Sequence, residues 1–237
     1  MSPPRAVKAV VFDMDGLLVD TEAVFRDVMM AASAARGVDL PEAVFLRMVG
    51  LPEHASRAVA MGHFGDGFDY DPWLAHVWEL AHERIEAGVP VKAGAAELLD
   101  ALDRARLPRA IATSSQHATV ERHLGPAGLL ERFDAVIAAG DYACGKPSPD
   151  PFLAAATRLG VDPADCLALE DSHNGVRAAH AAGMMTVMVP DLLTATPEIA
   201  KLCVAVAASL HEVRLMLEAA AITPCSPVLG TARTLGR

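Results

Sequence analysis

The sequence predicts an α/β fold: a doubly wound parallel sheet as the core, with an all-helical domain inserted into it. Two observations lead to this prediction. Short apolar runs alternate with longer amphipathic stretches along most of the 237 residues, which is typical of parallel βαβ units whose sheet is covered on both faces. The stretch from about Thr21 to Gly88 breaks this alternation, because it holds helical patterns and no convincing strand.

The core strands are expected where short apolar runs stand beside turn residues. The first is Ala6–Phe12, with Lys8 near its start. The others are Ala110–Thr113, Ala135–Ala139, Cys166–Leu169, Met185–Val189 and Cys203–Ala207. Helices are expected between most of them, at Ala95–Ala105, Ala118–Leu124, Asp150–Leu159 and Gly175–Ala182. Strands and helices in this order predict a Rossmann-like sheet.

The helical insertion is expected to form a small domain of its own. Its helical patterns lie near Glu22–Arg36, Pro41–Val49, Pro52–Met61 and Asp71–Ala87, with a Gly- and Asp-rich loop at Gly62–Asp71. The chain enters it through Leu17–Asp20 and leaves through Gly88–Gly94, whose glycines and proline suit a hinge. We therefore assign residues 1–20 and 89–220 to the core domain and 21–88 to the helical domain. Residues 221–237, rich in Pro, Thr, Ser and Gly, are expected to be a poorly ordered tail.

Composition excludes several classes of function. Hydrophobic residues make up 52% of the chain, but none of its apolar runs approaches the roughly 20 residues of a membrane span. The formal net charge of −10 disfavours nucleic acid polymers and anionic lipid as partners. The four cysteines are too far apart for a zinc or redox motif. We expect a cytoplasmic protein, a monomer or small homo-oligomer, that acts on a small molecule.

Polar side chains follow four of the predicted strands. Asp13 and Asp15 follow the first, Thr113 and Ser114 the second, Lys146 the third, and Glu170 with Asp171 the fourth. Ligands of open α/β sheets bind at the carboxyl ends of the strands. The sequence therefore predicts one site to which all four loops contribute.

The chemistry of these residues indicates phosphoryl transfer. Glu170 and Asp171 repel each other unless a cation lies between them, and Mg²⁺ prefers such hard oxygen ligands. With Mg²⁺ present, Asp13 can attack a phosphate ester and become an aspartyl phosphate. Asp15 can protonate the leaving oxygen and later deprotonate water. The Thr113 hydroxyl, the Ser114 N–H and the Lys146 ammonium can hold phosphoryl oxygens.

These segments together resemble the haloacid dehalogenase superfamily of phosphohydrolases. The first signature of that family is similar to Val11–Thr21, the second to Ile111–Ser115, the third to Gly145–Pro151 and the fourth to Leu169–Gly175. The helical insertion stands where the family has its helical cap. The resemblance implies Asp13 as nucleophile and Mg²⁺ ligand, Asp15 as acid/base and as a ligand through its carbonyl, and Glu170 and Asp171 as metal residues. It also implies that Thr113 and Lys146 hold phosphate.

Within the family, the chain is most similar to the β-phosphoglucomutase-like branch with a helical cap. The presence of Asp15 favours phosphate monoesters over halides and phosphonates. Mutases of that branch have a cap His where this chain has Phe25 and a cap Arg near the position of Glu53. The start of the chain and Gly183–Asp191 look more like pseudouridine-5′-phosphatase and glycerol-phosphate phosphatases. A phosphatase is therefore the first prediction, and a sugar-phosphate mutase the alternative.

Two further hypotheses remain open. The cap loop near Gly50, Glu53 and His54 is expected to contact substrate, and His117, beside the second motif, is a candidate to line the pocket. A signalling receiver module also combines a phosphorylatable Asp with a Lys on a doubly wound sheet. Receiver modules lack a large helical insertion and need no second catalytic Asp, so this alternative is the weaker one.

Overall fold

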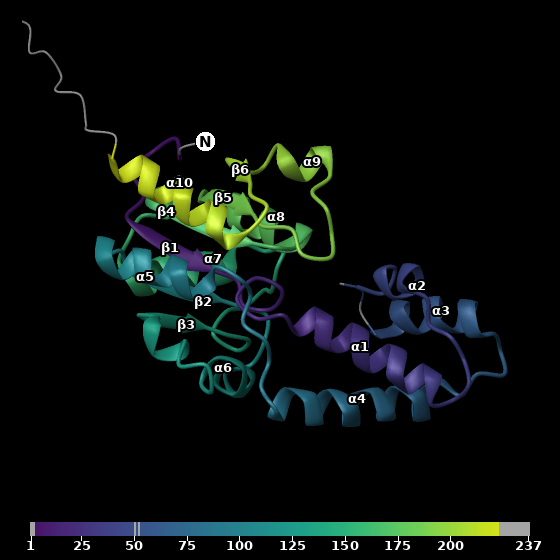
Figure 1. The fold of residues 1–237 in the computed structure, drawn as a ribbon. Coiled ribbons are helices and arrows are strands. Elements are labelled where there is room, and N and C mark those ends of the chain that lie inside the picture. The colour runs from purple at the N-terminus through teal and green to yellow at the C-terminus, as the bar shows by residue number, and fades with distance from the viewer. Residues whose placement is uncertain (1–2, 50, 52, 223–237) are drawn as a thin grey trace, which may run out of the picture.

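The computed structural model describes residues 3–49, 51 and 53–222 (Figure 1). Its centre is a parallel sheet of six strands in the order β3-β2-β1-β4-β5-β6. The strands are β1 (Ala9–Phe12), β2 (Arg109–Ala112), β3 (Ala135–Ile137), β4 (Cys166–Glu170), β5 (Met185–Met188) and β6 (Ala205–Val206). The prediction of a doubly wound α/β fold is confirmed.

Helices cover both faces of the sheet. These are α5 (Ala95–Ala105), α6 (His117–Leu124), α7 (Asp150–Leu159), α8 (His173–Ala181), α9 (Pro197–Ala200) and α10 (Leu210–Ile222), with the 3₁₀ turns η1 (Leu130–Arg132) and η2 (Pro163–Asp165). Helices α5, α6 and α10 pack on one face, and α7 and α8 on the other. Alternate side chains of β1 enter these two layers: Val10 and Phe12 the first, Ala9 and Val11 the second.

The insertion consists of α1 (Thr21–Ala34), α2 (Glu42–Leu46), α3 (Glu53–Phe64) and α4 (Tyr70–Glu86). These helices pack around a hydrophobic cluster of their own, and Trp73 is completely buried at its centre. The indole N–H of Trp73 donates to Ser33 Oγ at 3.0 Å, which satisfies the one polar atom that this burial removes from water. Figure 1 shows the insertion beside the end of the sheet at which β1 points.

Two chain segments connect the insertion to the sheet. The Asp20 carboxylate accepts from Ala23 N at 3.3 Å and so caps the start of α1. Val19 forms an isolated antiparallel bridge with Val91, so the outgoing and returning segments run side by side. The N–H groups of Asp20 and Lys92 donate across this pair, to the carbonyls of Pro90 at 2.8 Å and Leu18 at 2.9 Å.

Several local predictions need correction. The expected strand Cys203–Ala207 pairs only at Ala205–Val206, because it lies at the edge of the sheet with a single neighbour. Helix α3 continues through Gly62 to Phe64, so the loop is shorter than Gly62–Asp71. Helices α9 and α10 were not predicted, and α10 includes Ala221 and Ile222, the first residues of the expected tail. The rest of that tail lies outside the described residues.

In the part of the chain that the structure describes, every helix is too short or too polar to cross a membrane.

Candidate active site

The candidate site lies at the carboxyl ends of three adjacent strands, β2, β1 and β4. Asp13 follows β1, and its N–H donates to the carbonyl of Leu169 at 3.0 Å. Thr113 follows β2, and its N–H donates to the carbonyl of Ile137 at 3.0 Å. Both residues thus extend the backbone pairing of the sheet by one step, which fixes where their side chains emerge.

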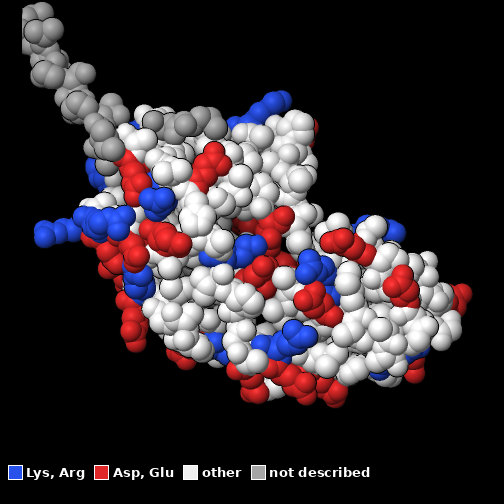
Figure 2. Space-filling view, in the orientation of Figure 1, with Lys and Arg blue, Asp and Glu red and all other residues white. Residues whose placement is uncertain are grey.

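A cavity of about 690 Å³ opens in front of these strand ends. Its lining includes Asp13, Asp15, Thr113, Ser114, Lys146 and Asp171 from the predicted site. It also includes residues from the predicted fourth motif and cap loop, namely Leu51, Ser172, His173 and Asn174. The sequence did not indicate the remaining lining residues, Glu22, Val49, Arg177 and Leu193. Figure 2 shows acidic side chains in the hollow between the sheet and the insertion. The cavity therefore lies between the two parts of the molecule.

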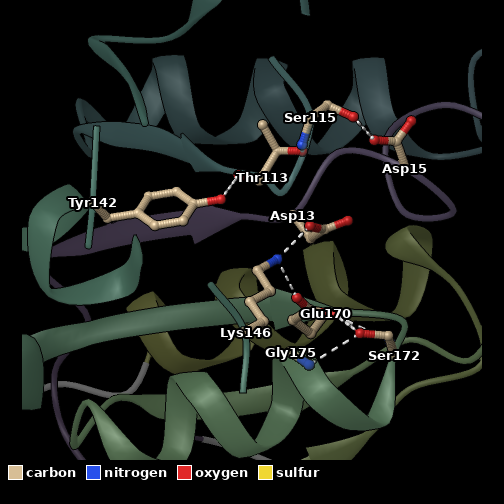
Figure 3. A network of polar contacts seen from close by, with 9 residues as sticks. All are labelled: Asp13, Asp15, Thr113, Ser115, Tyr142, Lys146, Glu170, Ser172 and Gly175. Atoms are coloured by element: carbon tan, nitrogen blue, oxygen red, sulfur yellow. Dashed lines mark hydrogen bonds and ion pairs between the residues drawn. The ribbon is translucent and has the colours of Figure 1, made fainter. Parts of the chain in front are cut away.

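Lys146 is buried between two carboxylates. Its ammonium donates to Asp13 Oδ1 and to Glu170 Oε1, the latter at 2.5 Å (Figure 3). Burial by itself lowers the pKa of Lys146, but the charges of Asp13 and Glu170 outweigh it and raise that pKa above its ordinary value. Lys146 therefore carries a fixed positive charge inside the site.

Glu170 is fully buried, and each of its oxygens has a partner. Oε1 accepts from Lys146, while Oε2 accepts from the backbone N–H and the hydroxyl of Ser172, both at 3.0 Å. Ser172 Oγ in turn accepts from Gly175 N at 3.0 Å, which caps the start of α8. A Cβ on Gly175 would overlap with the Glu170 carboxylate, so this position needs glycine.

Three carboxylates come together beside this ion pair. Oxygen atoms of Asp13, Glu170 and Asp171 all lie within 4.8 Å of one another. Burial raises the pKa of Asp13 to about 8, against the opposing effect of Lys146 and with help from Glu170 and Asp15. Burial, and then the charges of Glu170 and Asp13, also raise the pKa of Asp171 well above its ordinary value. A set of buried, mutually repelling oxygen donors fits a hard divalent cation.

Asp15 points away from Asp13 toward α6. Its Oδ2 accepts from the Ser115 hydroxyl at 2.8 Å, and its Oδ1 lies 3.6 Å from His123 Nδ1. His123 is buried, and its Nδ1 has no hydrogen-bond partner within 3.5 Å among the described residues. The sequence did not indicate His123, because it lies in the second turn of α6, well after the Thr113 motif.

The second motif is held by short-range contacts. Thr113 Oγ1 accepts from Ser115 N at 3.0 Å, and the hydroxyl of Tyr142 donates to the Thr113 carbonyl at 3.0 Å (Figure 3). Thr113 is buried, whereas Ser114 is exposed and faces the cavity. The Thr113 hydroxyl proton is then free to point toward a ligand in the cavity.

The remaining predicted substrate residues lie further from the strand ends. Glu53 lines a second cavity, inside the insertion, and its Oε1 lies 3.3 Å from Arg57 Nε. His54 is exposed and lines neither of these two cavities, and Gly50 lies outside the described residues. His117 is exposed and its Nε2 lies 2.9 Å from Asp141 Oδ2, outside the lining of the site cavity.

A buried lysine–carboxylate pair, a carboxylate cluster and a hydroxyl-bearing turn at one edge of a parallel sheet define a class of hydrolytic enzyme. Comparison with known proteins identifies the family. The model of the haloacid dehalogenase-like hydrolases matches residues 7–183. The chain belongs to this family and is an enzyme, a phosphoric monoester hydrolase.

Curated relatives cover most of the chain. A plasmid-encoded CbbY protein of Cupriavidus necator is 36% identical over 205 residues, 80% of either chain. Hexitol phosphatase B of Escherichia coli is 32% identical over 80% of this chain and 86% of its own. A probable pseudouridine-5′-phosphatase of Drosophila melanogaster is 34% identical over 79% and 83%.

Among solved structures, a haloacid dehalogenase family hydrolase of Deinococcus radiodurans is similar over nearly the whole chain. Its TM-score is 0.80 at 29% identity, and the match covers 91% of this chain and 96% of the other. That structure holds bound phosphate and sodium. The predicted resemblance to the family is confirmed.

Proposed function

We propose that this chain is a Mg²⁺-dependent phosphatase that hydrolyses small phosphate monoesters through an aspartyl phosphate on Asp13. One observation carries the proposal: the ammonium of Lys146 is buried between Asp13 and Glu170, beside Asp171, at the wall of a 690 Å³ cavity. A single lysine charge cannot balance the three carboxylates once all of them are ionised. The relatives named as phosphatases act on small phosphorylated compounds, and this supports the same class of substrate here.

The residues of the cluster fit a divalent cation. Asp13, Asp171 and the backbone carbonyl of Asp15 would hold Mg²⁺, with Glu170 within reach. When bound, the cation offsets the charge of the carboxylates and of the phosphate, so that an anionic nucleophile can approach. Gly16 lies against Asp171 so closely that a Cβ would overlap with its carboxylate, and any side chain there would crowd the metal ligand.

The chain's own residues supply the remaining chemistry. The Asp13 carboxylate attacks phosphorus, the bond from phosphorus to the ester oxygen breaks, and Asp15 gives that oxygen its proton. Water then attacks the phosphorus of the aspartyl phosphate while Asp15 takes a proton from that water. The bond from phosphorus to the Asp13 oxygen breaks, and inorganic phosphate leaves. Lys146, the Thr113 hydroxyl and the Ser114 N–H stabilise the phosphoryl oxygens during both steps.

The helical insertion acts as a cap in this proposal. It forms one side of the cavity through Glu22, Val49 and Leu51, and its closure would exclude bulk water from the reaction. A monomer or small homo-oligomer remains the expected assembly.

The test is a Mg²⁺-dependent phosphate-release assay over a panel of sugar, polyol and nucleoside monophosphates, with Asp13→Asn as the control. We expect the variant to lose about a thousandfold or more of kcat. Full activity in Asp13→Asn would remove Asp13 as the nucleophile.

Product analysis distinguishes the mutase alternative. With a hexose 1-phosphate, a phosphatase releases inorganic phosphate, whereas a mutase returns an isomerised sugar phosphate. Phe25 offers no imidazole and packs against Trp78, with ring centroids 5.4 Å apart. Glu53 is an anion where a mutase would need a cation. Both residues support the phosphatase.

A further inference from the structure

The insertion contains a cavity of its own beside the active site. It measures about 340 Å³ and shares three lining residues, Glu22, Val49 and Leu51, with the cavity in front of Asp13. The two cavities therefore adjoin at this group. A leaving group that extended from Asp13 past Leu51 would enter the insertion.

Aromatic and aliphatic side chains dominate the lining of this second cavity. Besides the shared residues and Glu53, the lining consists of Phe25, Met29, Phe45, Met48, Ser56, Tyr70, Trp73, Leu74, Val77 and Trp78. Most are packed into the core of the insertion, but Trp78 is 56% exposed. The Trp78 ring meets Phe25 edge to face at an interplanar angle of 82°. These two rings form an aromatic corner that a flat apolar group can contact.

The charges of this cavity exclude a second phosphate. Its described lining residues include two acids, Glu22 and Glu53, and no lysine or arginine. Arg57, the cation on the same helix as Glu53, is already paired with Glu53 and Asp71 and lies outside the lining. A phosphate at the far end of a substrate would lose its hydration without gaining a partner.

We propose that the substrate is a monophosphate ester whose leaving group carries an apolar or aromatic ring, and that the ring enters the second cavity against Phe25 and Trp78. This inference rests on the proposed function and names the substrate class of that same site. It disfavours sugar bisphosphates and small, fully hydroxylated polyol phosphates as preferred substrates.

The test uses substrate pairs that differ in one group. 2-Phenylethyl phosphate carries a phenyl ring that ethyl phosphate lacks, and uridine 5′-monophosphate carries a uracil ring that ribose 5-phosphate lacks. We expect kcat/KM to favour the ring-bearing member of at least one pair by about tenfold or more, the scale of an aromatic stacking contact. Fructose 1,6-bisphosphate should be hydrolysed at least about tenfold less efficiently than the preferred ring-bearing ester, because its second phosphate meets Glu22 and Glu53.

Variants identify the contact. Trp78→Ala should reduce the ring preference about tenfold, and Trp78→Phe, which keeps a ring, should keep most of it. Leu215→Ala is the matched control, because Leu215 is also 56% exposed but lies on α10 outside both cavities. Equal kcat/KM within both pairs, or a ring preference unchanged in Trp78→Ala, would overturn the inference. Asp13→Asn distinguishes failure of the proposed function from failure of this inference. If Asp13→Asn stays active, the proposed function fails. If Asp13→Asn is inactive but the parent protein shows no ring preference, only the inference fails.

Discussion

Replacing Asp13 with asparagine should make the metal-free protein more stable at alkaline pH while it removes turnover. An asparagine side chain has nearly the shape of a protonated aspartic acid and carries no charge. Burial, and after it the neighbouring carboxylates, raise the pKa of Asp13 from 3.8 to about 8 despite Lys146. The folded protein therefore binds a proton at Asp13 over a pH range in which the unfolded chain does not.

The sign and size of the change in stability follow from this difference in pKa between the folded and unfolded states. A group whose pKa is raised on folding contributes its stability below the unfolded pKa, near 4, and loses it as the pH rises through the folded value, near 8. Each pH unit within that window changes the free energy of unfolding by up to about 1.4 kcal/mol. Between pH 5 and pH 8 the parent protein should lose about 2–4 kcal/mol through Asp13, once partial relaxation of the site is allowed for. Asp13→Asn should not show this loss.

Urea denaturation in EDTA at pH 5, 6, 7 and 8 measures the effect. The difference between parent and Asp13→Asn measures Asp13 together with its coupling to Asp171, because burial of Asp171 contributes a slope of the same sign to both proteins. Asp66→Asn, at an exposed loop carboxylate, should keep the slope of the parent and serves as the control. Parallel pH profiles for the parent and Asp13→Asn would refute the reasoning, since they would mean that burial of Asp13 costs nothing.

Three further predictions concern the same site. Mg²⁺ at about 100 times its Kd should stabilise the parent by about 2.7 kcal/mol in thermal unfolding, and Asp13→Asn by clearly less; equal shifts would place the ion elsewhere. Gly175→Ala should destabilise by about 3 kcal/mol or more in urea, because its Cβ would overlap with Glu170, whereas Gly62→Ala, with open space around its Cβ, should be neutral or stabilising. His123→Leu should lower kcat about tenfold on alkyl phosphates but little on p-nitrophenyl phosphate, because the leaving group of p-nitrophenyl phosphate needs no acid. His123→Asn places an N–H near the Nδ1 position and should recover most of the activity on alkyl phosphates. Equal losses on both esters would mean that His123 does not position Asp15.

Much of the core could be predicted from the sequence, because the spacing of apolar residues and the order of strands and helices along the chain determine it. Ala95–Ala105 and Asp150–Leu159 are helices with the predicted bounds, because each ends at a residue in the left-handed conformation, Arg106 and Gly160. Helix α10 was not predicted, and the reason is physical. It follows a strand of only two residues, so no clear strand-to-helix transition marks its start.

The candidate site also has a part that the sequence predicts and a part that it does not. Asp13, Thr113 and Glu170 meet because they end or directly follow adjacent parallel strands, and strand order alone predicts that convergence. His123 reaches the site from a helix, and its contact with Asp15 depends on how α6 rotates about its axis as it packs. That rotation is decided by the two hydrophobic layers of the core and is not visible in a short motif. The cap loop is harder still: Glu53 and His54 are neighbours in sequence, yet only Glu53 lines the cavity of the insertion.

The hydrogen bonds around Lys146 indicate how its charge is directed. An ammonium has three N–H donors, and Asp13 and Glu170 accept from it. The Phe152 ring covers another side of Nζ, with its centroid 5.0 Å away. One N–H then remains for the cavity, which Lys146 lines. Glu170 in turn cannot rotate, because Ser172 holds its second oxygen and Gly175 packs against its carboxylate. We therefore propose that Glu170 acts through Lys146: it would fix the ammonium so that the remaining N–H is available to a phosphoryl group bound to Asp13.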